Sequence, residues 1–215
     1  MAELLVIRHA QASFGAENYD ALSHRGHKQS ELVGALLRER NWLPDRIVTG
    51  TLQRQAETLT SMGFAPQETR PGFDEYDFHN LLVCRFPDGV PHDVVKDRKT
   101  HFRTLRETLR MWQVGELDGV EETWMSFSIR VAQALADATR GGAQRVLVIS
   151  SGGPIGRMVS ATLGAPEEAM IALNLQVKNT SISRFIFNDH VRYLASFNET
   201  PHLDAPDRTD MLTYS

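Results

Sequence analysis

The chain has 215 residues, of which 41% are hydrophobic and 23% charged, a composition typical of a soluble protein with one large core. Its formal net charge of −4 excludes a general attraction to nucleic acid or anionic membranes, and we expect neither as a partner. A lone cysteine, Cys84, excludes an internal disulfide framework and fits a reducing cytoplasm.

The first part of the chain predicts two strand-helix units. The opening "MAELLVIRHA" has too short an apolar run for a signal peptide or membrane span, so we expect a cytoplasmic protein. Glu3 to Arg8 form a buried strand. "LSHRGHKQSELVGALLRER" predicts a helix with Ser23 as its N-cap. "RIVTG" is a second strand, and "TLQRQAETLTSMG" a second helix that stops at Gly63.

Residues 71–119 have a more irregular pattern. Aromatic and charged residues are mixed there until "HFRTLRETLRMW" places its apolar residues on one helical stripe. We interpret this segment as an insertion that covers one end of a sheet and forms a lid over the site.

The last part of the chain returns to alternating elements. Trp124, Phe127 and Val131 lie on one face of a long helix, and "RVLVIS" is a strand followed by a helix from "SGGPIG" to Gly164. "TSISRFIF" and "VRYLASF" are two final strands. The pattern predicts one domain over residues 1–215, a three-layer α/β/α sandwich with a mostly parallel central sheet.

Ligand sites in such folds lie at the carboxyl ends of strands. Arg8 and His9 follow the first strand, and "SSGG" ends the strand "RVLVIS". A neutral imidazole is a nucleophile for phosphorus, and a guanidinium binds phosphoryl oxygens bidentately. Arg54, near the start of the second helix, offers another guanidinium. Taken alone, Arg8 and His9 also fit a capping arginine beside a core histidine, and Arg54 fits a solvated helix position.

Glu75 lies among aromatic residues in "PGFDEYDFHN". Partial removal from water would raise its pKa and suit it to general acid catalysis. Asp74 and Asp77 compete with it on spacing alone, and an acidic turn that faces water is the simpler alternative. His79 follows closely enough to reach the same site.

Five segments together resemble one family. "LLVIRHAQAS" resembles the "RHG" signature of the histidine phosphatase superfamily, the phosphoglycerate mutase-like proteins. "LSHRGHKQ", "TLQRQAETL" and "FDEYDF" resemble three further family segments, and "NTSISRFIFNDHVRYLASFNETPHL" resembles the closing strands of the phosphatase branch. The resemblance covers nearly the whole chain, in order.

This resemblance implies hydrolysis of a small phosphomonoester. His9 would take the phosphoryl group and become phosphohistidine, while Arg8 and Arg54 hold its oxygens. Glu75 would protonate the leaving oxygen and later activate water. No metal or other cofactor is implied, the partner is a small phosphorylated substrate, and a homodimer is one option for the assembly.

The chain departs from the family where a second histidine is usual, because Ser151 aligns there. A serine keeps a neutral donor to the phosphoryl group, and loss of one such donor costs on the order of 10²–10³ in rate. The amides of Ser151, Gly152 and Gly153 at a helix start would also favour an anion. If the pocket is otherwise intact, we expect Ser151→His to raise the rate.

Two smaller departures concern the first loop. Ala10 replaces the usual glycine of the signature, and Gly15 stands where many members have a phosphate-contacting asparagine. We expect Gln11 or Ser13 to bind phosphate instead.

Other functions remain as alternatives. The missing second histidine favours a non-catalytic phosphate-ligand binder or regulatory protein, and a mutase is less favoured. A serine hydrolase is disfavoured because Ile149 occupies the first glycine of the nucleophile-elbow motif. His24 and His27 lack a carboxylate partner for a metal. The basic residues of "DVVKDRKTHFRTLR" would attract an anionic substrate or form a solvated face.

Overall fold

The computed structural model describes residues 1–13 and 20–214, so the prediction made for Gly15 lies outside the described residues. The elements follow in the order β1 (Ala2–Arg8), α1 (His24–Glu39), β2 (Arg46–Thr49), α2 (Gln53–Ser61), β3 (Glu68–Thr69), η1 (Pro71–Phe73), α3 (Phe78–Arg85), α4 (His92–Lys96), α5 (Arg98–Gln113), α6 (Trp124–Ala138), β4 (Arg145–Ser150), α7 (Gly152–Thr162), α8 (Ala169–Asn174), β5 (Ile182–Phe187), β6 (Arg192–Glu199), η2 (Pro201–Leu203) and η3 (Pro206–Met211).

The strands form one six-stranded sheet in the order β3-β2-β4-β1-β5-β6. The four strands from β3 to β1 are parallel, while β5 pairs antiparallel with β1 and β6 antiparallel with β5. The sheet is therefore mixed: the parallel part runs from the edge strand β3 to β1, and β5 and β6 form the antiparallel edge on the other side. Arg8 of β1 is opposite Ser150 of β4, so the loops that follow these two strands start side by side.

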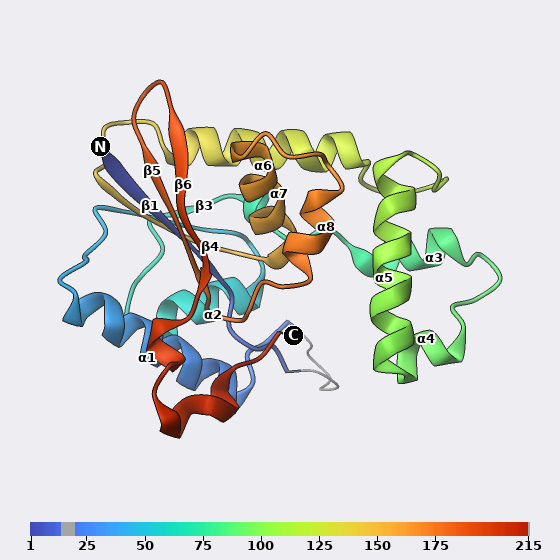
Figure 1. Ribbon diagram of the computed structural model, residues 1–215, viewed down its shortest axis with the longest axis horizontal. Coiled ribbons are helices and arrows are strands. Elements are labelled where there is room, and N and C mark those ends of the chain that lie inside the picture. Colours follow the sequence, from blue (N-terminus) through green and yellow to red (C-terminus); the bar gives the residue numbers. More distant parts are fainter. Residues whose placement is uncertain (14–19, 215) are drawn as a thin grey trace.

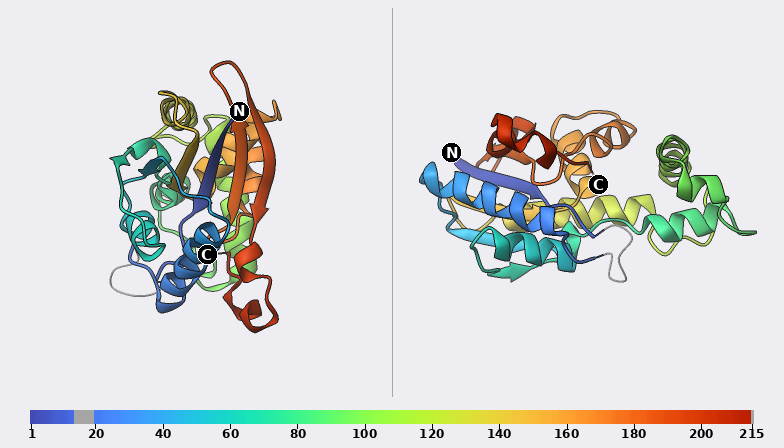
Figure 2. Two further views of the ribbon diagram at one scale, coloured as in Figure 1. Left: turned by 90° about the vertical axis from the view of Figure 1, so that its left-hand side faces the viewer. Right: turned by 90° about the horizontal axis from the view of Figure 1, so that it is seen from below.

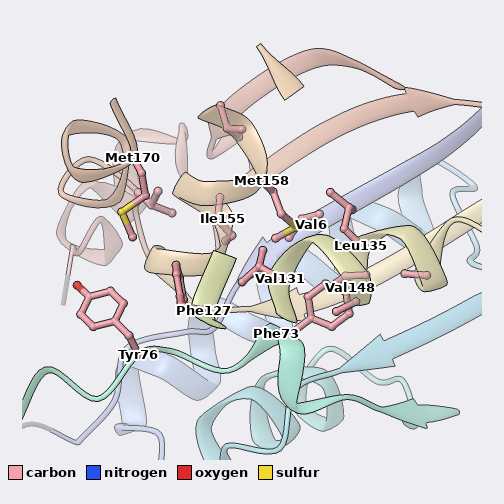
Figure 3. Close-up of a cluster of buried hydrophobic side chains, with 14 of the residues drawn as sticks. Val6, Phe73, Tyr76, Phe127, Val131, Leu135, Val148, Ile155, Met158 and Met170 are labelled. Carbon is pink, nitrogen blue, oxygen red and sulfur yellow. The ribbon is translucent and has the colours of Figure 1, made fainter. Parts of the chain in front are cut away.

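Alternation along the strands divides the core between the two faces of the sheet. Leu4 and Val6 of β1 pack in a cluster with α6 and α7, and Figure 3 shows part of this cluster. Leu5 and Ile7 point the other way, into a second cluster with α1 and α2. The sheet thus lies between two layers of helices (Figure 1, Figure 2), and the predicted three-layer sandwich is confirmed.

The insertion is more regular than its sequence suggests. The predicted helix is α5, which buries Leu109 and Trp112, and α3 and α4 precede it where no helix was expected. Arg85 of α3 donates hydrogen bonds to the carbonyl of Thr104 (3.1 Å) and to Thr108 Oγ1 (2.9 Å). These helices stand beyond the N-terminal end of α6 (Figure 1). That these helices form a lid over the site stays a prediction.

None of the described helices combines the length and the apolar content that a membrane span needs.

A buried histidine lies where β6 leads into η2. His202 is 2% exposed, and its Nε2 lies 2.9 Å from Thr180 Oγ1. Because that hydroxyl donates to the carbonyl of Asn179, it accepts from Nε2. Among the described residues Nδ1 has no partner. Burial, with a smaller contribution from the charge of Arg208, lowers the pKa of His202 to about 4.

The lowered pKa of His202 predicts a loss of stability in acid. The unfolded chain takes up a proton near pH 6.5 and the folded protein only near pH 4, so stability is lost as the pH falls through this window. Between pH 7 and pH 4.5, His202 lowers the free energy of unfolding by about 2–3 kcal/mol. Urea unfolding at both pH values should show a smaller pH difference for His202→Gln than for the wild type. An equal difference in the two proteins would contradict the assignment.

Candidate active site

The loops after β1 and β4 direct their side chains toward the helix layer that contains α2. His9 and Ser151 follow the strands by one residue, and they have the same parity as Ile7 and Ile149, whose side chains pack on α1 and α2. Contacts with α2 agree with this direction. Arg54 Nε lies 3.2 Å from His9 Nε2, and Gln55 Nε2 lies 3.0 Å from Ser151 Oγ.

The two hydrogen bonds of the His9 ring assign its tautomer. Nδ1 lies 2.8 Å from the carbonyl oxygen of Ala10, which only accepts, so Nδ1 carries a hydrogen. Nε2 faces the Nε–H of Arg54, which only donates, so Nε2 presents a lone pair. His9 is therefore a neutral imidazole whose Nε2 lone pair accepts from Arg54.

Electrostatics keep His9 in this state. His9 is 6% exposed, and burial together with the positive charges of Arg8 and Arg54 lowers its pKa well below the ordinary value. At neutral pH the ring is uncharged, as a nucleophile requires.

The backbone around His9 is held from two sides. The amide of Ala10 donates to Thr58 Oγ1 (2.9 Å), and the amide group of Asn179 donates to the carbonyl of His9 (3.1 Å). Thr58 belongs to the α2 segment that the sequence singled out. Asn179 was missed, because it lies 170 residues from His9 and no local pattern marks it.

The charges of two arginines, Arg8 and Arg54, act on His9, and both arginines have partners within the protein. Arg54 Nη1 pairs with the carboxylate of Asp20. Arg8 Nη1 donates to the carbonyls of Val177 and Tyr214 (2.6 Å). Asp20 thus places a carboxylate on the guanidinium that we expect to hold phosphate, and the sequence contained no signal for this pair.

Glu75 reaches the start of α7. Both carboxylate oxygens accept from the backbone N–H of Gly153, at 3.0 and 3.1 Å. A Cβ atom at position 153 would lie 2.1 Å from Glu75 Oε1, so the approach requires glycine. Burial raises the pKa of Glu75, although the Gly153 N–H and the charges of Arg54 and Arg8 act in the opposite direction. The amide of Gly153, which the sequence offered to phosphate, therefore binds Glu75.

The other two acidic candidates near Glu75 have structural partners. Asp74 accepts from the backbone N–H of Thr51 (2.6 Å), and Asp77 caps α3 by accepting from Asn80 N (3.0 Å). His79 is exposed. Glu75 is thus the carboxyl group that reaches the loop after β4.

A single arginine supports the loop that carries Glu75. Arg130 of α6 donates to the carbonyls of Pro71 (3.1 Å) and Asp74 (2.8 Å), and its guanidinium forms an ion pair with Glu122. Next along the chain, Tyr76 is buried and its ring packs edge-on against Phe127 (Figure 3).

The remaining predicted phosphate-binding residues have these surroundings. Gln11 accepts from the hydroxyl of Ser23 (3.0 Å), while the amide of Ser13 donates to the carbonyl of Ala21 (2.8 Å). Gly152 begins α7, and a Cβ atom there would lie 2.5 Å from Asn174 Oδ1. Phosphate binding by Gln11, Ser13 and Gly152 stays a prediction.

The structure also shows the surroundings of the histidines weighed as metal ligands and of the basic segment. His27 Nδ1 lies 2.8 Å from Ser61 Oγ. Within the described part of the chain, no three His, Cys, Asp or Glu residues gather closely enough to hold a metal ion. Lys99, Arg103 and Arg106 are exposed on α5, and attraction of an anionic substrate by them remains a prediction.

The comparisons identify one family. The model of the histidine phosphatase superfamily (branch 1) matches residues 4–200. No curated protein matches the chain.

Solved structures agree on the fold. The chain is similar to a mutant phosphoserine phosphatase from Entamoeba histolytica in complex with phosphoserine, with 22% identity and a TM-score of 0.66 over 94% of this chain and 100% of that one. It is also similar to the alpha-ribazole phosphatase from Shigella flexneri, with 19% identity and a TM-score of 0.67 over 92% of this chain and 96% of that one. A mycobacterial glucosyl-3-phosphoglycerate phosphatase has 17% identity and a TM-score of 0.67 over 93% of this chain and 100% of that one.

The pair between Arg54 and Asp20 predicts competition with phosphate. Asp20→Asn removes a carboxylate that neutralises Arg54, so we expect inorganic phosphate to bind about two- to fivefold more tightly, the effect of a partly exposed ion pair. Isothermal titration calorimetry with phosphate measures this change. Asp189→Asn, an exposed residue in the turn between β5 and β6, removes the same charge as a control. Equal affinities in both variants would contradict competition at Arg54.

Proposed function

The chain belongs to the histidine phosphatase superfamily, branch 1, and from this premise we propose that it hydrolyses a small phosphomonoester through a phosphohistidine on His9. The observation that carries the proposal is the neutral His9 ring, with hydrogen on Nδ1, a lone pair on Nε2 that faces Arg54, and a pKa lowered by burial and by the charges of Arg8 and Arg54. Small phosphorylated molecules are the proposed substrate class, as the names of the structural neighbours also suggest.

In the first step, the phosphoryl group enters beside Arg54 and displaces its Nε–H from His9 Nε2. The lone pair of Nε2 attacks phosphorus, and the bond between phosphorus and the ester oxygen breaks. Arg8 and Arg54 hold the phosphoryl oxygens and stabilise their charge. Glu75, whose raised pKa favours the protonated form, donates its proton to the leaving alcohol.

The second step returns the enzyme to its starting state. The Glu75 carboxylate takes a proton from water as the water oxygen attacks phosphorus. The bond between phosphorus and Nε2 breaks, and its electron pair restores the neutral imidazole. The products are inorganic phosphate and a protonated Glu75.

A second candidate function is a phosphate-ligand binder without turnover. Two points favour it: the family resemblance puts Ser151 where a second histidine is usual, and Asp20 already pairs with Arg54. The two candidates make the same use of Arg8 and Arg54, and they differ in the covalent step at His9.

The phosphohistidine is the first test. After rapid quenching with a ³²P-labelled sugar phosphate, the wild type should contain an acid-labile phosphoprotein and His9→Gln none. Label of equal amount in both proteins would reject His9 as the nucleophile. Micromolar binding of the ester in calorimetry without label or released phosphate would support the binder instead.

The role of Glu75 predicts a dependence on the leaving group. An alkyl phosphate needs a proton on the departing oxygen, whereas p-nitrophenolate leaves without one. Glu75→Gln should therefore lower kcat/KM, which reports the steps up to departure of the leaving group, about 10²–10⁴-fold for alkyl esters and far less for p-nitrophenyl phosphate. The wild type should also lose activity on alkyl esters as the pH rises through the raised pKa of Glu75, and Glu75→Gln should lose this alkaline limb. Steady-state kinetics over pH 5–9 test both points. Equal losses on both esters would contradict the assignment.

A further inference from the structure

Ser151 is in contact with a buried glutamine that the sequence did not single out. Gln55 follows Arg54 on α2, and both Gln55 and Ser151 have no exposed surface. The side-chain nitrogen of Gln55 donates to the carbonyl of Phe73 (2.9 Å) and to Ser151 Oγ (3.0 Å). Its side-chain oxygen accepts from the backbone N–H of Leu52 (3.3 Å). Since a backbone partner identifies each end of the amide, the group is oriented as a donor to Ser151.

The backbone makes room for this amide. A Cβ atom at Gly50 would lie 2.0 Å from Gln55 Oε1, so the end of β2 approaches the glutamine as closely as only glycine allows. The contact between Gln55 and Ser151 is therefore part of the packed interior and does not depend on one mobile surface side chain.

The donated hydrogen bond decides what the serine hydroxyl can do. A hydroxyl has one hydrogen and two lone pairs, and Gln55 occupies one of the lone pairs. Within the described part of the chain, Gln55 is the hydrogen-bond partner of this hydroxyl. His9 lies on the neighbouring strand end, because Arg8 is opposite Ser150 and the amide of His9 donates to the carbonyl of Ser150 (2.8 Å). The hydroxyl hydrogen is thus available beside the predicted nucleophile.

We propose that Gln55 is a positioning residue that fixes the Ser151 hydroxyl as a neutral hydrogen-bond donor to the phosphoryl group transferred to and from His9. The inference rests on the proposed function. Gln55 and Ser151 act as a pair in the place where the family resemblance puts a second histidine. Ser151→His by itself then introduces a larger ring against Gln55 and gives no gain in rate, in contrast to the expectation from the sequence.

The experiment compares wild type, Gln55→Met, Ser151→Ala and the double variant on p-nitrophenyl phosphate. Each single variant should lower kcat about tenfold, the effect of one ordinary hydrogen bond, and the double variant should be no slower than Ser151→Ala. KM and the inhibition constant of inorganic phosphate should change by less than kcat, because Arg8 and Arg54 are intact. If Gln55 only supported the structure of α2, Gln55→Met would instead weaken phosphate binding through Arg54. Gln144→Met, at an exposed position, is the control.

A second pair of variants keeps the test decisive if Gln55→Met does not fold. Ser151→His should be no faster than the wild type. The double variant Ser151→His with Gln55→Ala should be faster than the wild type, because Gln55→Ala removes the obstructing amide. Normal kcat in Gln55→Met, additive losses in the double variant, or a gain from Ser151→His alone would overturn the positioning role and leave the proposed phosphatase intact. A wild type without turnover and without phosphohistidine would overturn both.

Discussion

The parallel pairing of β1 with β4 is the constraint on which the site depends. With Arg8 opposite Ser150, the two strands end at the same level, and the next residues, His9 and Ser151, start neighbouring loops. Strand alternation then directs both toward the α1 and α2 layer, where α2 supplies Arg54 and Gln55. A shift of one residue in this register would point His9 to the opposite face of the sheet, away from Arg54.

Burial has opposite effects on the two titratable groups of the site. It lowers the pKa of His9 and raises that of Glu75, because in each case removal from water disfavours the charged form. A neutral imidazole and a protonated carboxyl group are the states that phosphoryl transfer to a histidine requires. The nearby positive charges assist the shift at His9 and oppose it at Glu75, so desolvation dominates there. Next to Glu75, the buried ring of Tyr76 packs against Trp112 and Phe127.

Much of the fold was predictable, since its elements have strong local signals. The apolar runs of β1 and β4 and the spacing of Phe127 and Val131 on α6 each identify an element within a few residues. Four short elements were not predicted, because their local sequence signals are weak. β3 has two residues and α4 five, too few for a period to show, and α3 and α8 lie in segments whose helical form depends on packing against α5 and α7.

The sequence by itself determined the layer architecture and the residues proposed for the chemistry, Arg8, His9, Arg54 and Glu75, because periodicity and motif order are local properties of a chain. Only the tertiary structure decided their partners. Asp20 on Arg54, Asn179 on the His9 carbonyl and Gln55 on Ser151 are contacts between segments 34 to 170 residues apart. Such contacts arise from strand order and register, which place distant backbones within hydrogen-bonding distance, and no local pattern records them.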